Sequence, residues 1–185
     1  GAHVGLYGVQ RLGAFYLAGT TEYAHFSNTT SRDINWVVAE QASAKFSSDA
    51  LSARLEAGYR RSFDVYTVTP FVGLGVAHLR TDGFTEERTG RLGLTFDSNS
   101  VTSVTSSVGI QLNTRIALPT GGLLTPFVRI AWIHEFNPAR SVDSFLTMSP
   151  AASFSLQATP AASDLAKINA GVKLDLSERL ALFAY

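Results

Sequence analysis

The chain has 185 residues, enough for one substantial domain, and no cysteine, which excludes a disulfide framework and thiolate metal sites. Fifteen basic residues balance fifteen acidic ones, so the net charge gives no support for nucleic-acid binding, which usually needs a basic surface. Charged residues make up only 16% of the chain, well below the roughly 25% of ordinary soluble domains. This shortage of charge indicates a surface that does not face water.

The sequence contains no apolar run of about 18 residues, so we expect no transmembrane helix. It begins at Gly1 without a Met, a basic segment or an apolar stretch, so no signal peptide is present to read. We expect that such a peptide was removed or that the chain is an excised piece. A transmembrane β-barrel stays compatible with this hydropathy, because alternation averages each strand to near neutrality.

The first half of the chain predicts extended strands separated by polar segments. Residues 4–11 and 14–26 predict a strand pair joined by a tight turn at Gly13. The polar cluster 27–33, SNTTSRD, predicts a loop. Residues 34–46 are compatible with a short helix or with a continued strand.

The clearest strand of the chain is residues 51–61, LSARLEAGYRR, which follows a turn predicted at 47–49. An extended backbone sends alternate side chains to opposite faces, whereas a helix would mix the charged residues with the leucines. One face then carries Leu51, Ala53, Leu55, Ala57 and Tyr59, and the other carries Ser52, Arg54, Glu56, Gly58 and Arg60.

A second strand at residues 65–80 has one aliphatic face and one face of unusually small residues that includes Gly73 and Gly75. Glycine inside a strand is typical of a close approach by other groups, so we expect packed side chains over these positions. A connection at 62–64 precedes this strand, and a longer polar loop at 81–90 follows it.

The second half repeats the same rhythm of strands and connections. We predict strands at 91–97, 104–116, 125–136, 145–157 (interrupted by Pro150), 167–176 and 180–185. The connections between them fall at 118–123, 137–144 and 158–164. The total is roughly nine strands with short turns alternating with longer loops, which is typical of an up-and-down barrel.

Two architectures could use such two-faced strands. A soluble antiparallel sheet would turn the charged face to water, whereas a membrane barrel would enclose it. Strand length favours the barrel, because a tilted membrane-spanning strand needs about 9 to 11 residues and globular strands are commonest near 5 to 6. Aromatic residues near strand ends fit an interfacial girdle: Tyr59, Trp132, Phe136 and Tyr185. We therefore predict an all-β, antiparallel up-and-down transmembrane β-barrel.

This fold assigns a side to each residue of the clean strands. We expect these polar residues to face the lumen: Arg54, Glu56, Arg60, Gln111, Asn113, Arg115, Arg129, Glu135, Lys167, Asn169, Lys173 and Asp175. We expect these residues to face lipid: Leu51, Leu55, Tyr59, Val72, Leu74, Val108, Ile110, Leu112, Ile130, Trp132, Ile168, Val172 and Leu174.

Several blocks of the sequence resemble the β-domain of autotransporters, the translocator module of type V secretion. The blocks are VGLYG, FYLAGTTEYAHF, SARLEAGYR, TPFVGLGVAHLRTDGFTE, SVGIQL, LTPFVRIAWIHEF and KINAGVKLDLSERLALFAY. Their order and spacing agree with the family over nearly the whole chain. EAGYR and LTPF…W.HEF are the most specific of them.

The resemblance implies a twelve-stranded barrel in the outer membrane of a Gram-negative bacterium, with a pore helix inside it. The barrel would help its own N-terminal passenger to reach the cell surface. Its partners would be outer-membrane lipid, the passenger, the pore helix and the barrel-assembly machinery. Against this pattern, the pore helix and the first strands are missing before Gly1, and the chain stops at Tyr185 within an expected penultimate strand, without the terminal Phe. We therefore interpret residues 1–185 as a partial autotransporter translocator domain.

The sequence gives little support for a catalytic site or a metal-binding site. The four histidines, His3, His25, His78 and His134, lack the spacing of a metal motif, and no GxSxG elbow exists. Glu56 and Glu135 could form an acid/base pair, but balancing nearby arginines is the simpler role. We expect no catalytic residue, no metal and no cofactor. Two alternatives to a translocator stay open at this point: an outer-membrane barrel enzyme of the lipase or protease type, and a soluble β-sandwich binding module.

Overall fold

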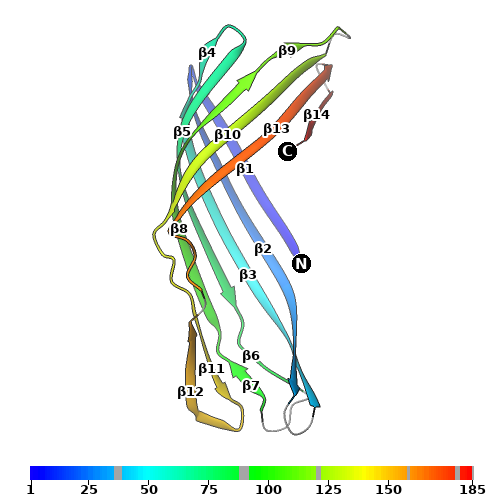
Figure 1. Ribbon diagram of the computed structural model, residues 1–185, viewed down its shortest axis with the longest axis vertical. Coiled ribbons are helices and arrows are strands. Elements are labelled where there is room, and N and C mark those ends of the chain that lie inside the picture. The colour runs from blue at the N-terminus through cyan, green and yellow to red at the C-terminus, as the bar shows by residue number, and fades with distance from the viewer. Residues whose placement is uncertain (36–38, 88–91, 120–121, 158, 178–179, 185) are drawn as a thin grey trace.

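A ten-stranded antiparallel sheet, curled into a trough, dominates the computed structural model of the protein (Figure 1). The structure describes residues 1–35, 39–87, 92–119, 122–157, 159–177 and 180–184. The main strands are β1 (Ala2–Leu12), β2 (Phe15–Asn35), β3 (Ala39–Tyr59), β5 (Tyr66–Thr81), β8 (Asn99–Thr114), β10 (Leu123–Glu135), β13 (Asp164–Ser177) and β14 (Leu180–Ala184). The described residues include no helix long and apolar enough to span a membrane.

Strands follow one another around the sheet in chain order, so the topology is up-and-down. Two short strands, β4 (Arg61–Phe63) and β9 (Ile116–Ala117), extend the pairing of β5 and β10. The predicted turn between β1 and β2 is confirmed, and Gly13 there adopts φ +63°, a conformation that suits glycine. β1 and β14 lie at the two edges of the described sheet.

The connections opposite the Gly13 turn are long and carry a second, four-stranded sheet, at the bottom of Figure 1. It comprises β6 (Phe84–Thr85), β7 (Leu94–Phe96), β11 (Ser141–Leu146) and β12 (Ser149–Gln157), in the spatial order β12-β11-β7-β6. One end of the molecule therefore has short turns, and the other end has structured loops.

Several sequence predictions are wrong at this loop end. The loop predicted at 27–33 and the turn predicted at 47–49 lie inside β2 and β3, which pair without a break from Phe15 and Tyr59 to Asn35 and Ala39. The interstrand ladder satisfies their backbone groups, so polar side chains do not end the strands. The extended alternative is right for the described part of 34–46, while residues 36–38 lie outside the described residues.

Two further predictions need correction. The loop predicted at 81–90 contains β6, although its residues 88–90 lie outside the described residues. The single strand predicted at 145–157 is a hairpin of β11 and β12, and the loop predicted at 137–144 contains the start of β11. Pro150 lies within β12, where an edge position tolerates its missing N–H donor.

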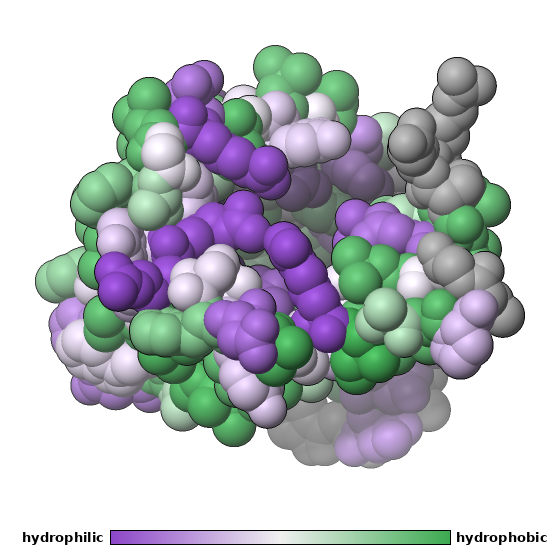
Figure 2. Space-filling view, turned by 90° about the horizontal axis from the view of Figure 1, so that it is seen from above, coloured by the Kyte–Doolittle hydropathy of each residue, from purple (hydrophilic) through white to green (hydrophobic). Residues whose placement is uncertain are grey.

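Large apolar side chains of the main sheet are exposed instead of forming a core. Leu6, Leu55 and Ile168 are 74%, 58% and 69% exposed, and four of the six buried hydrophobic residues are alanines. Figure 2 shows mostly hydrophilic residues in the hollow of the trough and hydrophobic residues around its outside. The described sheet therefore has a polar inner face and an uncovered apolar outer face, which is the opposite of a soluble sandwich.

Small residues on the inner face let neighbouring side chains lie against the backbone, as expected for Gly73 and Gly75. A Cβ added at Gly73 would lie 2.7 Å from Ser107 Oγ and 3.8 Å from Arg54 Nη2. At Gly109, an added Cβ would lie 2.5 Å from Phe71 Cζ and would also collide with the backbone oxygen of Ile130.

We expect Gly109→Ala to destabilise the domain by about 1–3 kcal/mol, because the added methyl group overpacks the Phe71 ring against rigid backbone. Urea unfolding of the detergent-refolded protein, followed by Trp fluorescence, measures the change. Gly8→Ala is the matched control, since a Cβ at Gly8 meets nothing within 4 Å. Equal stability of the two variants would contradict the packing argument.

An ion pair and an aromatic stack join the second sheet to the long strands. Arg32 of β2 donates two hydrogen bonds to the carboxylate of Glu86, at 3.1 and 2.6 Å, and Glu86 also accepts the Leu94 N–H at 3.0 Å. Beside this pair, the Phe84 ring stacks between Phe46 and Phe96, with centroid distances of 4.3 and 4.6 Å.

Glu86 lies outside the strands that border the hollow. Its burial and its hydrogen bonds determine the pKa of its carboxyl group. Burial acts to raise the pKa of the Glu86 carboxyl, but the hydrogen bonds from Arg32 and Leu94 outweigh burial and hold the pKa below its ordinary value of 4.5. A carboxyl with a depressed pKa contributes stability above the ordinary value. That contribution is lost as the pH falls through the lowered pKa.

We expect acidification below about pH 4 to loosen the attachment of β6 and β7, lowering their amide protection factors roughly fivefold to tenfold after correction for intrinsic exchange. Hydrogen exchange with mass spectrometry measures this change. Glu86→Gln should show the looser attachment at neutral pH, whereas Glu87→Gln should behave as the natural protein. Protection that is unchanged in Glu86→Gln would show that the ion pair does not hold the loops.

Candidate functional site

The inner face of the main sheet brings most of the predicted polar residues together. Two neighbouring hollows, of about 330 and 290 Å³, share Glu56 and Arg129 in their walls. Between them they are lined by eight of the twelve polar residues selected from the sequence: Arg54, Glu56, Arg60, Gln111, Asn113, Arg129, Lys167 and Asn169.

Glu56 is the centre of this polar face. Its carboxylate accepts a hydrogen bond from Tyr16 Oη at 2.8 Å and one from Arg129 Nη2 at 2.5 Å, with Arg54 Nη2 at 3.7 Å. β5 and β8 lie between the strands of Glu56 and Arg129, so a flat sheet would hold their backbones about 14 Å apart. The contact therefore exists because the sheet curls toward its polar face.

Arg129 is held on several sides. Its guanidinium lies 3.6 Å from the centroid of the Phe71 ring, a cation–π contact, and its Nη1 donates to Gln111 Oε1 at 3.4 Å. Gln111 in turn donates to Asn113 Oδ1 at 3.0 Å. The Glu56 and Arg129 side chains are only 13% and 21% exposed, so their pairing is shielded from bulk water.

The two hollows carry more positive than negative charge. Arg11, Arg54, Arg60, Arg129 and Lys167 line them, against the single carboxylate of Glu56. Among the described residues, Arg11, Arg60 and Lys167 form no ion pair. The inner face can therefore hold water and anionic or hydrogen-bonding groups of a polypeptide.

Sequence reasoning did not select Arg11 and Tyr16, which also line the inner hollow. Alternation in the first hairpin is imperfect, because Tyr7 and Val9 share the parity of Arg11. The only signal in the sequence was that Arg11 lies at the end of an extended segment. A charged residue at that position is equally typical of a turn and of a polar strand face.

The remaining four predicted polar residues lie near the ends of the strands, outside the two hollows. Lys173 and Asp175 form an ion pair at 2.6 Å on β13. Arg115 follows β8 at the short-turn end, with its backbone N–H bonded to Val65. Glu135 ends β10 at the loop end.

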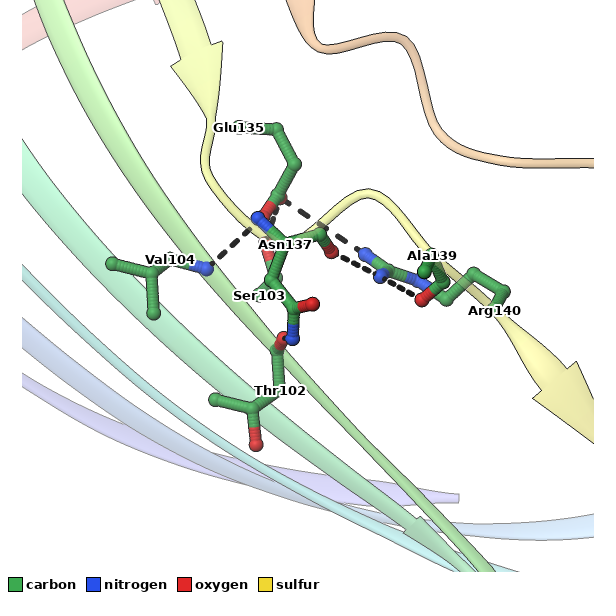
Figure 3. A network of polar contacts seen from close by, with 7 residues as sticks. All are labelled: Thr102, Ser103, Val104, Glu135, Asn137, Ala139 and Arg140. Carbon is green, nitrogen blue, oxygen red and sulfur yellow. Dashed lines mark hydrogen bonds and ion pairs between the residues drawn. The ribbon is translucent and has the colours of Figure 1, made fainter.

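Glu135 fastens the end of β10 to β8, where the chain enters its longest loop (Figure 3). Its carboxylate accepts hydrogen bonds from Ser103 Oγ, from the Val104 N–H at 3.2 Å and from the Asn137 N–H at 2.9 Å. Asn137 Nδ2 donates to the Thr102 carbonyl at 2.7 Å, and Arg140 lies 4.0 Å from Glu135. These bonds give Glu135 a structural role at the strand end.

The outer face carries the predicted aliphatic rows in register. Val72, Val108 and Ile130 are 56%, 48% and 48% exposed. Trp132, level with Val108 and Val72 in the strand register, and Phe136, just after β10, are 50% and 60% exposed. Tyr185, which was predicted to be part of an aromatic girdle, lies outside the described residues.

Histidines lie on the same outer face near the loop end. His25 Nδ1 and Tyr23 Oη both contact Asp49 Oδ1, at 2.9 and 2.6 Å. In a similar arrangement, His134 Nδ1 and Trp132 Nε1 both contact Asp164 Oδ1, at 2.9 and 3.0 Å. Within the part of the chain that the structure describes, no group of three or more acidic or histidine side chains could hold a metal ion.

A curled, up-and-down antiparallel sheet with a charged hollow and an apolar exterior defines the class of protein as a wall of an outer-membrane type β-barrel. The family model "Autotransporter beta-domain" matches residues 1–185. The chain therefore belongs to the autotransporter β-domain family, the translocator of type V secretion. This finding confirms the resemblance and the fold class predicted from the sequence.

The chain is also similar to individual curated proteins. The chain is 26% identical over 181 residues to an "Extracellular serine protease" of Serratia marcescens, and the match covers 97% of this chain and 17% of that protein. It is 30% identical over 142 residues to an "Uncharacterized protein in trpE-trpG intergenic region" of Pseudomonas putida, covering 75% of this chain and 23% of that protein. The chain thus spans about a sixth to a quarter of the length of these relatives.

The fold resembles the crystal structure of the β-domain of the Bordetella autotransporter BrkA, with a TM-score of 0.59 at 20% sequence identity. The match covers 98% of this chain and 62% of that β-domain. At this identity, the likeness concerns the fold alone.

We expect a double-mutant cycle of Glu56→Gln and Arg129→Gln to give a coupling energy of about 1–2 kcal/mol, because both groups are shielded and hydrogen-bonded. Urea unfolding of the four proteins measures it. The matched cycle of Lys173→Gln and Asp175→Asn should give less than about 0.5 kcal/mol, since that pair is more exposed, at 51% and 30%. A coupling energy near zero for the first pair would contradict the argument that shielding from water strengthens this contact.

Proposed function

We propose that residues 1–185 form part of a translocator domain in the outer membrane of a Gram-negative bacterium, where the domain anchors and helps export an N-terminal passenger of the same polypeptide. The observation that carries the proposal is the separation of the two faces, with charge gathered in the hollow and aliphatic residues uncovered on the outside. Membership of the autotransporter β-domain family supports it.

In this proposal the inner face lines a hydrated lumen and the outer face meets lipid. The twelve polar residues selected from the sequence are then lumen residues, and the thirteen apolar and aromatic ones are lipid residues. Hydrocarbon offers no hydrogen bonds, so only groups satisfied by the ladder or by the lumen are tolerated there. Enclosure of Arg54, Glu56 and Arg129 in the hollow meets this requirement.

The lumen would guide a polypeptide without catalysing a reaction. Its excess of cationic side chains suits a passing chain or a pore helix that carries acidic groups, and its hydroxyl and amide groups can exchange hydrogen bonds with an extended backbone. We propose no catalytic residue and no cofactor. Membrane insertion would depend on the barrel-assembly machinery, because the uncovered aliphatic rows would aggregate in water.

A charge placed on either face of β13 tests the proposal. Ile168 is 69% exposed on the outer face, and its neighbour Asn169 lines an inner hollow. We expect Ile168→Lys to impair assembly in the outer membrane, because a lysine in mid-membrane costs about 2–4 kcal/mol. Asn169→Lys should assemble and display its passenger as the natural protein does. Heat-dependent electrophoretic mobility and protease access to the passenger in whole cells measure the two effects.

Normal assembly of Ile168→Lys together with failure of Asn169→Lys would show that the faces are inverted and would contradict the proposal. Accumulation of the natural protein in solution without detergent would contradict it as well and would favour a soluble binding module.

A further inference from the structure

The outer face of β5 and β8 becomes more polar toward the loop end of the sheet. Along β5, the outward side chains are Val72, Leu74, Val76, His78 and Arg80. On the neighbouring strand β8, Val104 pairs with Val76, but Thr102 pairs with His78 and Ser100 pairs with Arg80. Ser106, paired with Leu74, is an earlier polar group on β8, but from the row of His78 onward the outward groups of both strands are all polar.

A small polar hollow of about 230 Å³ lies at this boundary. It is lined by His78, Arg80, Ser98, Asn99 and Ser100. His78 Nδ1 lies 2.9 Å from Thr102 Oγ1, which fixes the imidazole ring beside the hollow. The hollow thus combines a guanidinium, an imidazole and two serine hydroxyls, which are groups that bind phosphate.

The guanidinium of Arg80 is available to a ligand. Among the described residues it forms no ion pair within 4.0 Å. Asp49 pairs with Arg80 in the register of β3 and β5, but its Oδ1 atom already accepts from Tyr23 and His25. No carboxylate of the described residues therefore contacts the Arg80 guanidinium within 4.0 Å, although Asp49 attracts it over a longer distance.

An apolar groove of about 490 Å³ opens on the same face, nearer the middle of the sheet. Its walls include Leu55, Val72, Leu74, Val108 and Trp132. Leu74 lies four residues from His78 on β5, or about 13 Å along the strand. A strand tilt of about 40° makes this about 10 Å in depth, which lies within the roughly 15 Å of one leaflet of a bilayer. The cationic hollow at the polar boundary thus lies toward the loop end from an apolar groove, at the depth where the acyl chains of a lipid would lie.

We propose that the outer face binds a phosphorylated lipid, with its phosphate against Arg80, His78 and Ser100 and an acyl chain in the groove beside Leu74 and Val108. The proposal rests on the proposed function, because it requires the outer face to meet lipid. Outer-membrane barrels place their longer loops outside the cell, so the lipid belongs to the outer leaflet. A free phosphate ion would use the hollow without the groove, and a zwitterionic lipid would gain less from the Arg80 charge.

Binding of diphosphoryl lipid A to the full-length protein in detergent, measured by native mass spectrometry, tests the site. We expect Arg80→Gln to weaken this binding roughly fivefold to tenfold, through the loss of a charge-assisted contact. Arg115→Gln is the matched control, since Arg115 lies at the other end of the β8 strand, and it should bind as the natural protein does. Phosphatidylcholine should bind more weakly than lipid A and should not distinguish Arg80→Gln from the natural protein.

Unchanged lipid A binding in Arg80→Gln, or an equal loss in Arg115→Gln, would overturn the site. Displacement of lipid A by millimolar inorganic phosphate would also overturn it and would indicate a free-anion site. Heat-dependent mobility of all three proteins reports assembly separately. If Arg80→Gln assembles normally and its lipid A binding is unchanged, only the lipid site is overturned. If the natural protein itself does not assemble in membranes, the proposed function is overturned as well.

Discussion

The two-residue repeat of the β-strand is the constraint on which this structure depends. It sends Arg54 and Glu56 to one face and Leu55 to the other, and the interstrand ladder satisfies the backbone between them. Because the sheet also curls, the polar face becomes a hollow in which residues of distant strands meet, as Glu56 and Arg129 do. The same curl spreads the aliphatic rows over the outside, where no second layer covers them among the described residues.

Curvature toward the polar face requires small residues on the inner side. Phe71 lies over Gly109, Tyr16 lies over Gly58, and Phe127 lies over Gly171, so each aromatic ring occupies the space that a side chain would fill. The rings, in turn, position polar groups: Tyr16 donates to Glu56, and Phe71 supports the guanidinium of Arg129. Packing and electrostatics on the inner face are therefore parts of one arrangement.

Sequence reasoning succeeded where alternation was strict and failed where tertiary pairing replaced it. Parity alone separated the polar from the apolar residues of 51–59 and 167–176, and several of those polar residues meet around Glu56, while their facing to lumen and lipid stays a prediction. The segment 27–33 was predicted as a loop because Ser, Asn and Asp favour turns, yet its pairing with β3 keeps it extended beyond the apolar rows. The β11–β12 hairpin was missed because Pro150 was interpreted as an interruption of one strand. Pro150 in fact lies inside the edge strand β12, where its missing backbone N–H leaves no partner unsatisfied.

The sequence by itself determined the strand period, the identity of the two faces and the family, since these depend on residue order and on recurring local blocks. Only the tertiary structure decided which polar residues touch, because the contact between Glu56 and Arg129 spans 73 positions and needs the curl of four strands. The ion pair of Glu86 with Arg32 and the cross-strand pairing of Arg80 with Ser100 likewise depend on how the strands pair. Register depends on pairing between distant segments, which no local pattern encodes.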